Sequence, residues 1–387
     1  MRIADVAEFF AEAGGGVKTY LEAKLAAGAR HGHEVVLIAP GAEDGEETRA
    51  GGRILWVKSP PVPGDPRYRL LVSRARVHAA LDRVRPHLVE ASSPYGGAHF
   101  AASWAPARAR VLVFHQDPVA ALAHPVLDRY LRPEQLDRAA APIWAYLRRL
   151  GRRFDATVVA GAWLAERLTG FGLERVEAIP FGVDPRPFWS ARRSTERVVE
   201  LKAKLGLPPG GVALVAVSRH HPEKRLTTLI EAVRSIDPRR ERPVGLVVYG
   251  DGPDRARVER AARGCGRIWV AGYTRNRAAL AAGLAAADAF LHGSAAETFG
   301  LVVSEALAAG LPLVVPDAGG AREVADPRFA ETYRAGDAAG CADAIRRLLD
   351  RDLSVLRPIA REAGSRVRTL DAHFAELFAH YARLVGR

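Results

Sequence analysis

Residues 288–320 read DAFLHGSAAETFGLVVSEALAAGLPLVVPDAGG and contain a complete strand–helix–strand unit. The pattern predicts a buried strand over 288–294 and then a helix that Gly310 and Pro312 end. A second apolar strand, LPLVVP, follows and closes on a glycine turn. Strands that alternate with helices lie parallel in one sheet with helices on both faces, so this stretch predicts an α/β fold.

The same alternation runs through the chain in two series. In the first series we predict buried strands at 34–40, 87–93, 110–117 and 156–162. In the second series we predict strands at 212–219, 243–252 and 267–273, ahead of the two strands in the opening stretch. Each series is long enough for one open parallel sheet, so the chain is predicted to form two Rossmann-like domains.

The boundary between these domains is predicted near IPFGVDPRPFW, residues 179–189. Its prolines, its glycine and its Asp-Pro step interrupt both strand and helix patterns. We therefore predict an N-terminal domain over 1–182 and a C-terminal domain over 183–365. Residues 366–387 form a predicted helix that packs back on the N-terminal domain. The alternative is a helix that packs only on its own domain.

The composition is that of a globular protein with a strong positive charge. The chain has 387 residues, 48% of them hydrophobic, and a formal net charge of +12. Such a charge favours an anionic partner, namely nucleic acid, an anionic membrane or a phosphorylated substrate, unless the arginines simply cover solvated faces. Cys265 and Cys341 lack metal-ligand spacing, which fits a reducing cytoplasm. No secretory signal is expected in MRIADVAEFF, and no run approaches the roughly 18 apolar residues of a membrane span.

Two glutamates flank the start of the helix in the opening stretch. Glu297 lies in the strand-to-helix loop, and Glu305 lies about one turn inside the helix. The amides of Phe299, Gly300 and Leu301 belong to the set that a helix N-terminus leaves without intrahelical partners. A carboxylate accepts two hydrogen bonds, which suits the diol of a sugar or a ribose. The alternative makes Glu297 a cap and Glu305 a surface residue favoured by the helix dipole.

The stretch SRHHPEKR, residues 218–225, follows the strand VALVAV and precedes a helix predicted to start near Leu226. It places Arg219 and Lys224 at a helix N-terminus, where two cations oppose the dipole unless an anion is present. A phosphate would resolve this conflict, because arginine and lysine both bind phosphate. The alternative is a solvated basic turn.

Further candidates lie in other loops. The glycines of AGGGVKTYL, residues 13–21, allow a backbone to approach an anion, or simply form a tight turn. His115 ends a strand and could face a ligand, although a lone histidine there is more often structural, and Asp117 is a candidate acceptor-side group. The turn with Gly319 and Gly320 could border a sugar site.

Taken together, these stretches resemble the family 4 retaining glycosyltransferases, whose GT-B architecture has two Rossmann-like domains facing across a cleft. The most specific block is ETFGLVVSEALAAGLPLVVPDAGGAREV at 297–324. GGGVKTYLEAKLAAGARHGHEVVLIAP, IPFGVD and SRHHPEKR support the resemblance. Three features depart from the family pattern. LHGSAAE replaces the usual Pro-Ser before the first glutamate, Arg225 replaces a common glycine, and Ser218 replaces Gly.

The resemblance implies roles for the glutamate block. Glu297 would contact the hydroxyls of the transferred sugar, and Glu305 would hold the ribose diol. Phe299, Gly300 and Leu301 would offer backbone amides to the diphosphate or the sugar.

It also implies roles outside that block. Arg219 and Lys224 would neutralise the diphosphate leaving group, and Gly15 and Gly16 would let a loop approach it. His115 would lie against the sugar. The nucleobase would contact Gly272 and Tyr273.

The predicted activity is transfer of a hexose from a UDP-, GDP- or ADP-sugar to an acceptor hydroxyl, with retention of configuration. No paired acidic motif indicates a divalent metal, and no cofactor is expected, because cationic side chains can stabilise the charge on the diphosphate. Two enzymatic alternatives keep the fold, a sugar-nucleotide epimerase and a glycosyl phosphorylase. Two non-enzymatic alternatives are a nucleic-acid binder and an inactive sugar-nucleotide binder.

The acceptor is predicted to be a lipid or a lipid-linked glycan at the inner face of the cell membrane. The first domain is Arg-rich, most densely in YLRRLGRRFD at 146–155, and Trp144, Tyr146 and Leu147 lie beside that run. Basic groups next to aromatic ones suit an anionic membrane interface. The alternative is a helix that buries its aromatic side chains and solvates its arginines.

Overall fold

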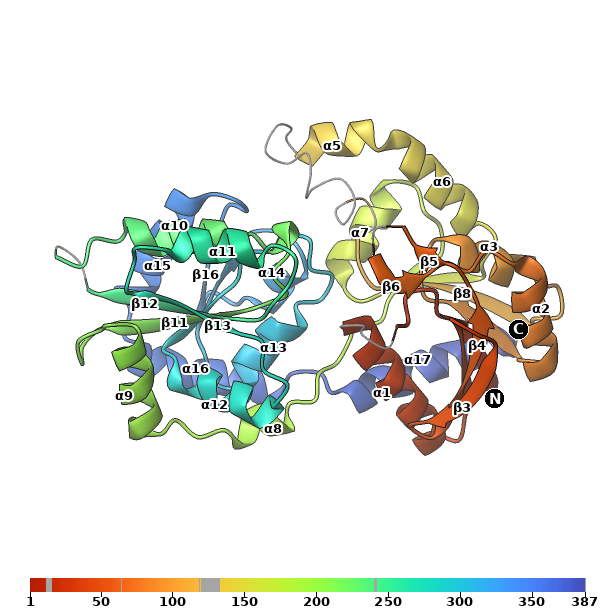
Figure 1. Cartoon of the computed structure of the whole chain (residues 1–387), viewed down its shortest axis with the longest axis horizontal. Coiled ribbons are helices and arrows are strands. Elements are labelled where there is room, and N and C mark those ends of the chain that lie inside the picture. Colours follow the sequence, from red (N-terminus) through yellow and green to blue (C-terminus); the bar gives the residue numbers. More distant parts are fainter. Residues whose placement is uncertain (12–15, 64, 118, 120–132, 240–241, 387) are drawn as a thin grey trace. The chain divides into compact units, whose positions relative to one another are not determined.

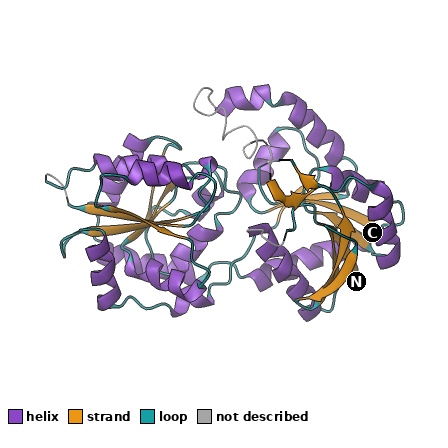
Figure 2. Cartoon of the chain, viewed as in Figure 1, coloured by secondary structure: helices purple, strands orange, loops and turns teal. Residues whose placement is uncertain are grey.

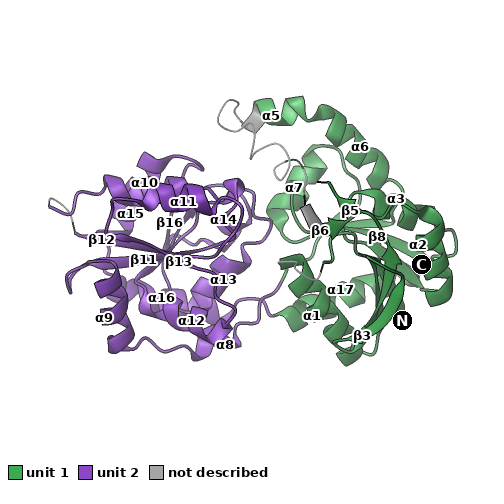
Figure 3. Cartoon of the chain, in the orientation of Figure 1, with its two compact units in different colours: residues 1–181, 370–387 green, residues 182–369 purple. Residues whose placement is uncertain are grey.

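The computed structural model describes residues 1–11, 16–63, 65–117, 119, 133–239 and 242–386. The chain divides into two compact units (Figure 3). Unit 1 comprises residues 1–181 and 370–387, and unit 2 comprises residues 182–369. In each unit a mainly parallel sheet carries helices on both faces (Figures 1 and 2), so the predicted pair of Rossmann-like domains is confirmed.

The sheet of unit 1 has the order β10-β9-β8-β7-β1-β2-β4-β3. All its pairs are parallel except β3 with β4. Its strands, with the small β5–β6 hairpin, are β1 (Arg2–Val6), β2 (Glu34–Gly41), β3 (Gly45–Arg49), β4 (Gly52–Lys58), β5 (Pro61–Val62), β6 (Asp65–Arg69), β7 (Leu88–Ala91), β8 (Ala109–Phe114), β9 (Ala156–Val159) and β10 (Val176–Ala178). Its helices are α1 (Gly16–Arg30), α2 (Arg74–Val84), α3 (Gly96–Ser103), α5 (Pro133–Ala139), α6 (Ala141–Gly151), α7 (Ala162–Gly170) and α17 (Leu370–Val385).

The sheet of unit 2 has the order β13-β12-β11-β14-β15-β16, and every pair in it is parallel. Its strands are β11 (Val212–Val217), β12 (Val244–Tyr249), β13 (Ile268–Gly272), β14 (Ala289–Leu291), β15 (Leu313–Pro316) and β16 (Ala330–Tyr333). Its helices are α8 (Arg186–Ser190), α9 (Thr195–Lys204), α10 (Leu226–Ser235), α11 (Arg255–Ala262), α12 (Arg277–Ala286), α13 (Leu301–Ala308), α14 (Gly320–Val324), α15 (Ala338–Leu349) and α16 (Leu353–Ser365), with a 3-10 turn η1 at Pro222–Lys224.

Strand β11 shows why these apolar runs form a sheet covered on both sides. Val212, Leu214 and Ala216 pack into one apolar cluster, whereas Ala213 and Val215 pack into the cluster on the other face. Successive side chains of a strand point to opposite faces, so a continuous apolar run fills two cores at once. The helices on either face supply the other half of each core.

The predicted strands are generally longer than the observed ones at their carboxyl ends. The prediction 110–117 extends past the end of β8 at Phe114, and the prediction 288–294 extends past the end of β14 at Leu291. In both cases the extra residues are mostly polar, and they form the loop that follows the strand. Periodicity therefore located the strands, and side-chain polarity marks where they end.

The last helix belongs to unit 1, although the chain reaches it through unit 2. Phe374, Leu377 and Tyr381 of α17 are buried, and the helix packs against α1. The two connections between the units run side by side, because Val183 pairs with Thr369 and its amide donates to the carbonyl of Arg368 at 2.9 Å. The predicted divisions fell after residues 182 and 365, whereas the units divide after residues 181 and 369.

A buried cluster of charges lies under α1 and α17 in unit 1. The ammonium of Lys24 is fully buried and donates to Asp5 Oδ2 at 2.9 Å and to Glu90 Oε2. Tyr381 donates to the same Glu90 oxygen at 2.6 Å, and Ser92 donates to Asp5 Oδ1 at 2.6 Å. Burial, together with the neighbouring Asp5 carboxylate, raises the pKa of Glu90 to about 7. The hydrogen bond from Tyr381 fastens the C-terminal helix to this cluster.

Replacement of the buried cation should destabilise unit 1. In Lys24→Met, two carboxylates remain in a site with no solvent access, so the free energy of unfolding should fall by about 3–5 kcal/mol. Lys18→Met is the matched control on the same helix, because Lys18 is partly exposed and its pair with Glu22 spans 4.0 Å. The control should change stability by less than about 1 kcal/mol. Urea unfolding followed by tryptophan fluorescence measures both, and equal losses would contradict the cluster's structural importance.

Candidate active site

The strand order of unit 2 reverses direction between β11 and β14. From β11 the chain proceeds outward through β12 and β13, whereas from β14 it proceeds through β15 and β16 on the other side. The loops that follow β11 and β14 therefore diverge, and ligands of open parallel sheets bind at the carboxyl ends of the strands at such a point. The predicted stretch 218–225 follows β11, and the first predicted glutamate follows β14.

An ion pair joins these two loops. Lys224 Nζ lies 2.7 Å from Glu297 Oε1 and 3.3 Å from Glu223 Oε1. Burial alone would lower the pKa of Lys224, but the two carboxylates raise it above its ordinary value. Burial opposes ionisation of Glu297 too, yet the Lys224 ammonium lowers the pKa of that carboxyl. Both groups are thus charged near neutral pH, and their side chains are 16% and 20% exposed, which leaves them accessible to a ligand.

The second predicted cation, Arg219, is placed differently. It lies two residues after β11 and is exposed. Within the part of the chain that the structure describes, its guanidinium has no hydrogen bond or ion pair. An uncompensated guanidinium at the carboxyl edge of a parallel sheet is suited to an anion. The structure thus brings Lys224 and Glu297 together and leaves Arg219 available beside the same strand.

Glu305 is buried in α13 and paired with a residue that we did not predict. Its carboxylate accepts from Arg277 at 2.8 Å, and Arg277 begins α12. Burial raises the pKa of Glu305, which Arg277 opposes and nearby Asp184 reinforces. Its 9% exposure excludes the alternative of a plain surface residue. We did not predict Arg277 as a site residue because it follows a different strand from Glu305. Its place at a helix N-terminus was a signal that could have identified it.

The start of α13 has the geometry expected for an anion site. Gly300 caps the helix with φ 71° and ψ 49°, a left-handed conformation that favours glycine. Gly300 itself has no side chain with which to cap this terminus. The amides of the first turn, including that of Leu301, lack intrahelical acceptors by the geometry of any helix. The predicted role of this turn toward a diphosphate or a sugar remains a prediction.

The turn at Gly319 and Gly320 supports the loop that carries Glu297. The amide of Gly320 donates to the carbonyl of Glu297 at 2.6 Å. A Cβ on Gly319 would lie 2.5 Å from the carbonyl oxygen of Ala295, and one on Gly320 would lie 2.5 Å from the carbonyl carbon of Thr298. Backbone packs directly on backbone here, which only glycine allows. The glycine turn therefore fixes the position of the Glu297 loop.

The predicted site residues Gly15, Gly16 and His115 belong to unit 1. Gly15 lies outside the described residues, and Gly16 is the exposed first residue of α1. His115 follows β8 and its ring lies 4.9 Å from that of Tyr20. Burial lowers the pKa of His115 to about 4, so its imidazole is neutral. Its contact with a sugar stays a prediction.

Asp117 has a structural explanation. It is 1% exposed, forms an ion pair with Arg167 and accepts from the amide of Val119 at 2.8 Å. Arg167 also binds Asp137 at 2.6 Å, so it joins the loop after β8 to α5 and α7. These contacts account for the burial of Asp117, and the acceptor-side role that we predicted for it remains untested.

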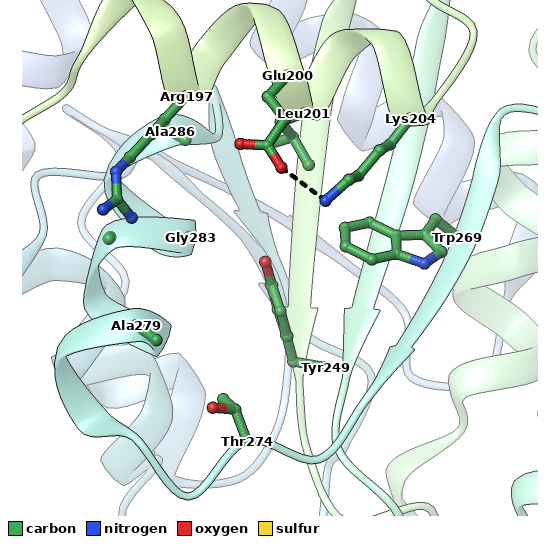
Figure 4. Close-up of a pocket in the computed structure, with 11 residues that line it drawn as sticks. Arg197, Glu200, Leu201, Lys204, Tyr249, Trp269, Thr274, Ala279, Gly283 and Ala286 are labelled. Carbon is green, nitrogen blue, oxygen red and sulfur yellow. Dashed lines mark hydrogen bonds and ion pairs between the residues drawn. The ribbon is translucent and has the colours of Figure 1, made fainter.

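The predicted nucleobase contacts lie at the end of β13. Gly272 has φ 80°, and its carbonyl accepts from the amide of Gly250 at 2.8 Å, whereas Tyr273 is 69% exposed. A cavity of about 300 Å³ opens beside the next residue, Thr274 (Figure 4). Figure 4 shows that Tyr249 and Trp269 line it from the sheet, and that Lys204 reaches it from α9. It contains none of the predicted site residues.

Two Rossmann-like units, with the Lys224–Glu297 pair at the switch point of the second, fit a nucleotide-sugar-dependent glycosyltransferase of the GT-B type. The model of Glycosyltransferase Family 4 matches residues 14–186, and the model of Glycosyl transferases group 1 matches residues 211–351. The chain belongs to this glycosyltransferase family. The resemblance to this family that the sequence motifs indicated is thereby confirmed.

Similar proteins agree with this assignment. A GDP-mannose-dependent alpha-mannosyltransferase of Mycobacterium tuberculosis is 32% identical over 84% of this chain and 82% of its own length. A GDP-mannose-dependent alpha-(1-6)-phosphatidylinositol dimannoside mannosyltransferase of the same species is 30% identical over 89% and 84%. The solved sucrose-phosphate synthase of Thermosynechococcus elongatus has a TM-score of 0.79 at 19% identity, with 100% and 99% of the two chains covered. The last similarity shows the fold alone.

A methyl group on the glycine turn should disturb the Glu297 loop. In Gly320→Ala the new Cβ meets backbone atoms of Thr298 and Phe299, neither of which can move without shifting the loop. We expect glycosyl transfer to fall at least about 10-fold, because misplacement by about 1 Å costs on the order of 10²-fold in rate. Gly210→Ala is the control, since a Cβ there meets nothing within 4 Å. Steady-state kinetics with equal activity in both variants would contradict the supporting role of this turn.

Proposed function

We propose that this protein transfers a mannosyl group from GDP-mannose, with retention of anomeric configuration, to a hydroxyl of a membrane lipid. The single observation that carries the site assignment is the Lys224–Glu297 pair at the switch point of unit 2. The donor is proposed from the relatives, since those at 32% and 30% identity are named as GDP-mannose-dependent enzymes.

Glu297 and Glu305 suit the two polyol parts of such a donor. Glu297 is partly exposed on the loop at the switch point, so its carboxylate can accept from hydroxyls of the hexose. Glu305 is more deeply buried and held by Arg277, so it offers its remaining acceptor sites in a fixed direction, which suits the ribose diol. The resemblance at 297–324 implies the same division of roles.

Arg219, Lys224 and the N-terminus of α13 would stabilise the leaving diphosphate. Negative charge grows on this group as the glycosyl–phosphate bond breaks, and preorganised donors lower the barrier most. Arg219 has no competing partner among the described residues, and Lys224 already carries its charge. We propose that these groups replace a divalent metal, so that chelation should leave the rate unchanged. With the leaving phosphate accepting the acceptor's proton, attack would occur on the face that the diphosphate leaves, which retains configuration.

Loss of one phosphate-binding cation should lower turnover strongly. The assay is the hydrolysis of the donor in the absence of acceptor. GDP-mannose should be hydrolysed slowly, and UDP-glucose and ADP-glucose should be hydrolysed more slowly still. Lys224→Ala should reduce the rate about 10²–10³-fold, since it removes a charge from the transition state. Lys202→Ala is the control, because Lys202 lies in the last turn of α9 and donates to the Pro209 carbonyl at 2.7 Å. Release of GDP measures both, and full activity of Lys224→Ala would refute the site.

A lipid acceptor is supported by the surface of α6 and the names of relatives. Arg149 of α6 is exposed, as are Arg152 and Arg153 directly after the helix. Trp144 and Leu147 are buried, whereas Tyr146 reaches the surface with 37% exposure. The predicted aromatic contribution is thus mostly internal, and the arginines would carry the attraction to anionic lipid. Across the part of the chain that the structure describes, no helix has the length and apolar character to cross a bilayer.

Charge reversal on this surface should weaken binding to anionic vesicles. Arg149, Arg152 and Arg153 changed together to Glu should lose most co-sedimentation with phosphatidylinositol vesicles at low salt, because each basic group contributes about 1 kcal/mol. The matched control reverses Arg257, Arg260 and Arg263, three exposed arginines of unit 2. Equal binding of the two variants would rule out the α6 surface.

The proposed retention of configuration has its own measurement, because NMR of the mannolipid product reads the anomeric configuration.

A further inference from the structure

His292 lies directly behind the ion pair of the proposed site. It is the first residue after β14, it is 3% exposed, and its ring stacks on that of Phe290 at 6.2 Å between centroids. Its amide donates to the carbonyl of Val314 at 2.9 Å, and its carbonyl accepts from the hydroxyl of Tyr333 at 2.6 Å. The backbone and the ring face of His292 are thus fixed by the sheet.

One ring nitrogen of His292 is not accounted for by these contacts. Nε2 of His292 is buried and has no hydrogen-bond partner among the residues that the structure describes. It lies 3.9 Å from Glu297 Oε1, which is too long for a hydrogen bond. A buried polar atom without a partner is unfavourable, so such atoms are rare and often belong to functional sites.

The ring of His292 is neutral and can donate a hydrogen bond from one of its nitrogens. Burial lowers the pKa of His292 to about 4, an effect that the Glu297 carboxylate opposes and the Lys224 ammonium reinforces. A neutral imidazole carries one hydrogen, and in the tautomer with hydrogen on Nε2 it can donate toward Glu297 without adding a charge.

Donor binding would change the surroundings of Glu297. This step rests on the proposed function, in which Lys224 neutralises the diphosphate. As Lys224 turns toward that anion, Glu297 loses its 2.7 Å contact with the ammonium. A largely buried carboxylate that loses its partner is strongly disfavoured unless another donor replaces it. Glu297 also has to keep one orientation in order to bind sugar hydroxyls.

We infer that His292 is a positioning residue for Glu297, and that its Nε2–H replaces Lys224 as the hydrogen-bond donor to Oε1 when the diphosphate binds. A shift of about 1 Å brings the 3.9 Å separation to a normal hydrogen-bond length of roughly 2.9 Å. The second carboxylate oxygen then faces the hexose.

Two substitutions at one position test this assignment. His292→Leu removes the donor, and His292→Gln keeps an N–H at a similar distance. With GDP-mannose, His292→Leu should lower kcat/KM about 10- to 100-fold, because the carboxylate is no longer held in one orientation. Affinity for GDP alone, measured by titration calorimetry, should change less than twofold, since Glu297 acts on the sugar. His292→Gln should recover most of the activity.

Thermal stability separates positioning from a structural role. His292→Leu removes a buried polar atom without a partner, so its melting temperature should equal or exceed that of the wild type. A fall in melting temperature with equal losses in both variants would make His292 structural and overturn the inference. If kcat/KM is unchanged in His292→Leu while Lys224→Ala is impaired, only the inference about His292 is refuted and the proposed function stands. Unchanged turnover in both would remove the proposed function as well.

Discussion

The reversal of strand order between β11 and β14 is the constraint on which the site depends. Neighbouring parallel strands whose chains leave in opposite directions cannot cover the sheet edge between them, so the edge stays open there. This geometry places both residues of the Lys224–Glu297 pair, one on each of the two diverging loops. The open edge also explains why charged groups are tolerated next to two apolar cores, since a ligand or water can reach them.

The charged groups of the two units differ in what their neighbours leave unsatisfied. In unit 1, Lys24 is matched by two carboxylates without solvent access, and a tyrosine and a serine complete their hydrogen bonds. That arrangement holds helices together and leaves nothing for a ligand. In unit 2, Lys224, Glu297 and Arg219 keep exposed surface, and His292 keeps a polar atom without a partner among the described residues. Incomplete satisfaction, rather than the presence of charge, marks the second group as a binding site.

The sequence predicted the two sheets and the places of Glu297, Glu305 and Lys224, because strand periodicity and polarity after a strand are local signals. It could not predict that Arg277 holds Glu305, since that contact joins two helices that follow different strands. It also overstated the exposed aromatic surface of α6, because helical spacing does not say which neighbour covers a face. Trp144 stacks on Phe171 of a later segment, with centroids 4.0 Å apart. Pairings of this kind depend on tertiary packing.

Glycines connect the fold to the orientation of the charged side chains. A Cβ on Gly293 would lie 2.5 Å from the carbonyl oxygen of Lys224, and one on Gly252 would lie 2.4 Å from that of His220. With the Gly319–Gly320 turn, these contacts pack successive post-strand loops against one another at main-chain distance. Loops packed in this way cannot shift independently, so a side chain can reorient only about its own bonds. Rearrangement on donor binding is thereby confined to side chains such as Lys224, while the backbone that carries Glu297 stays in place.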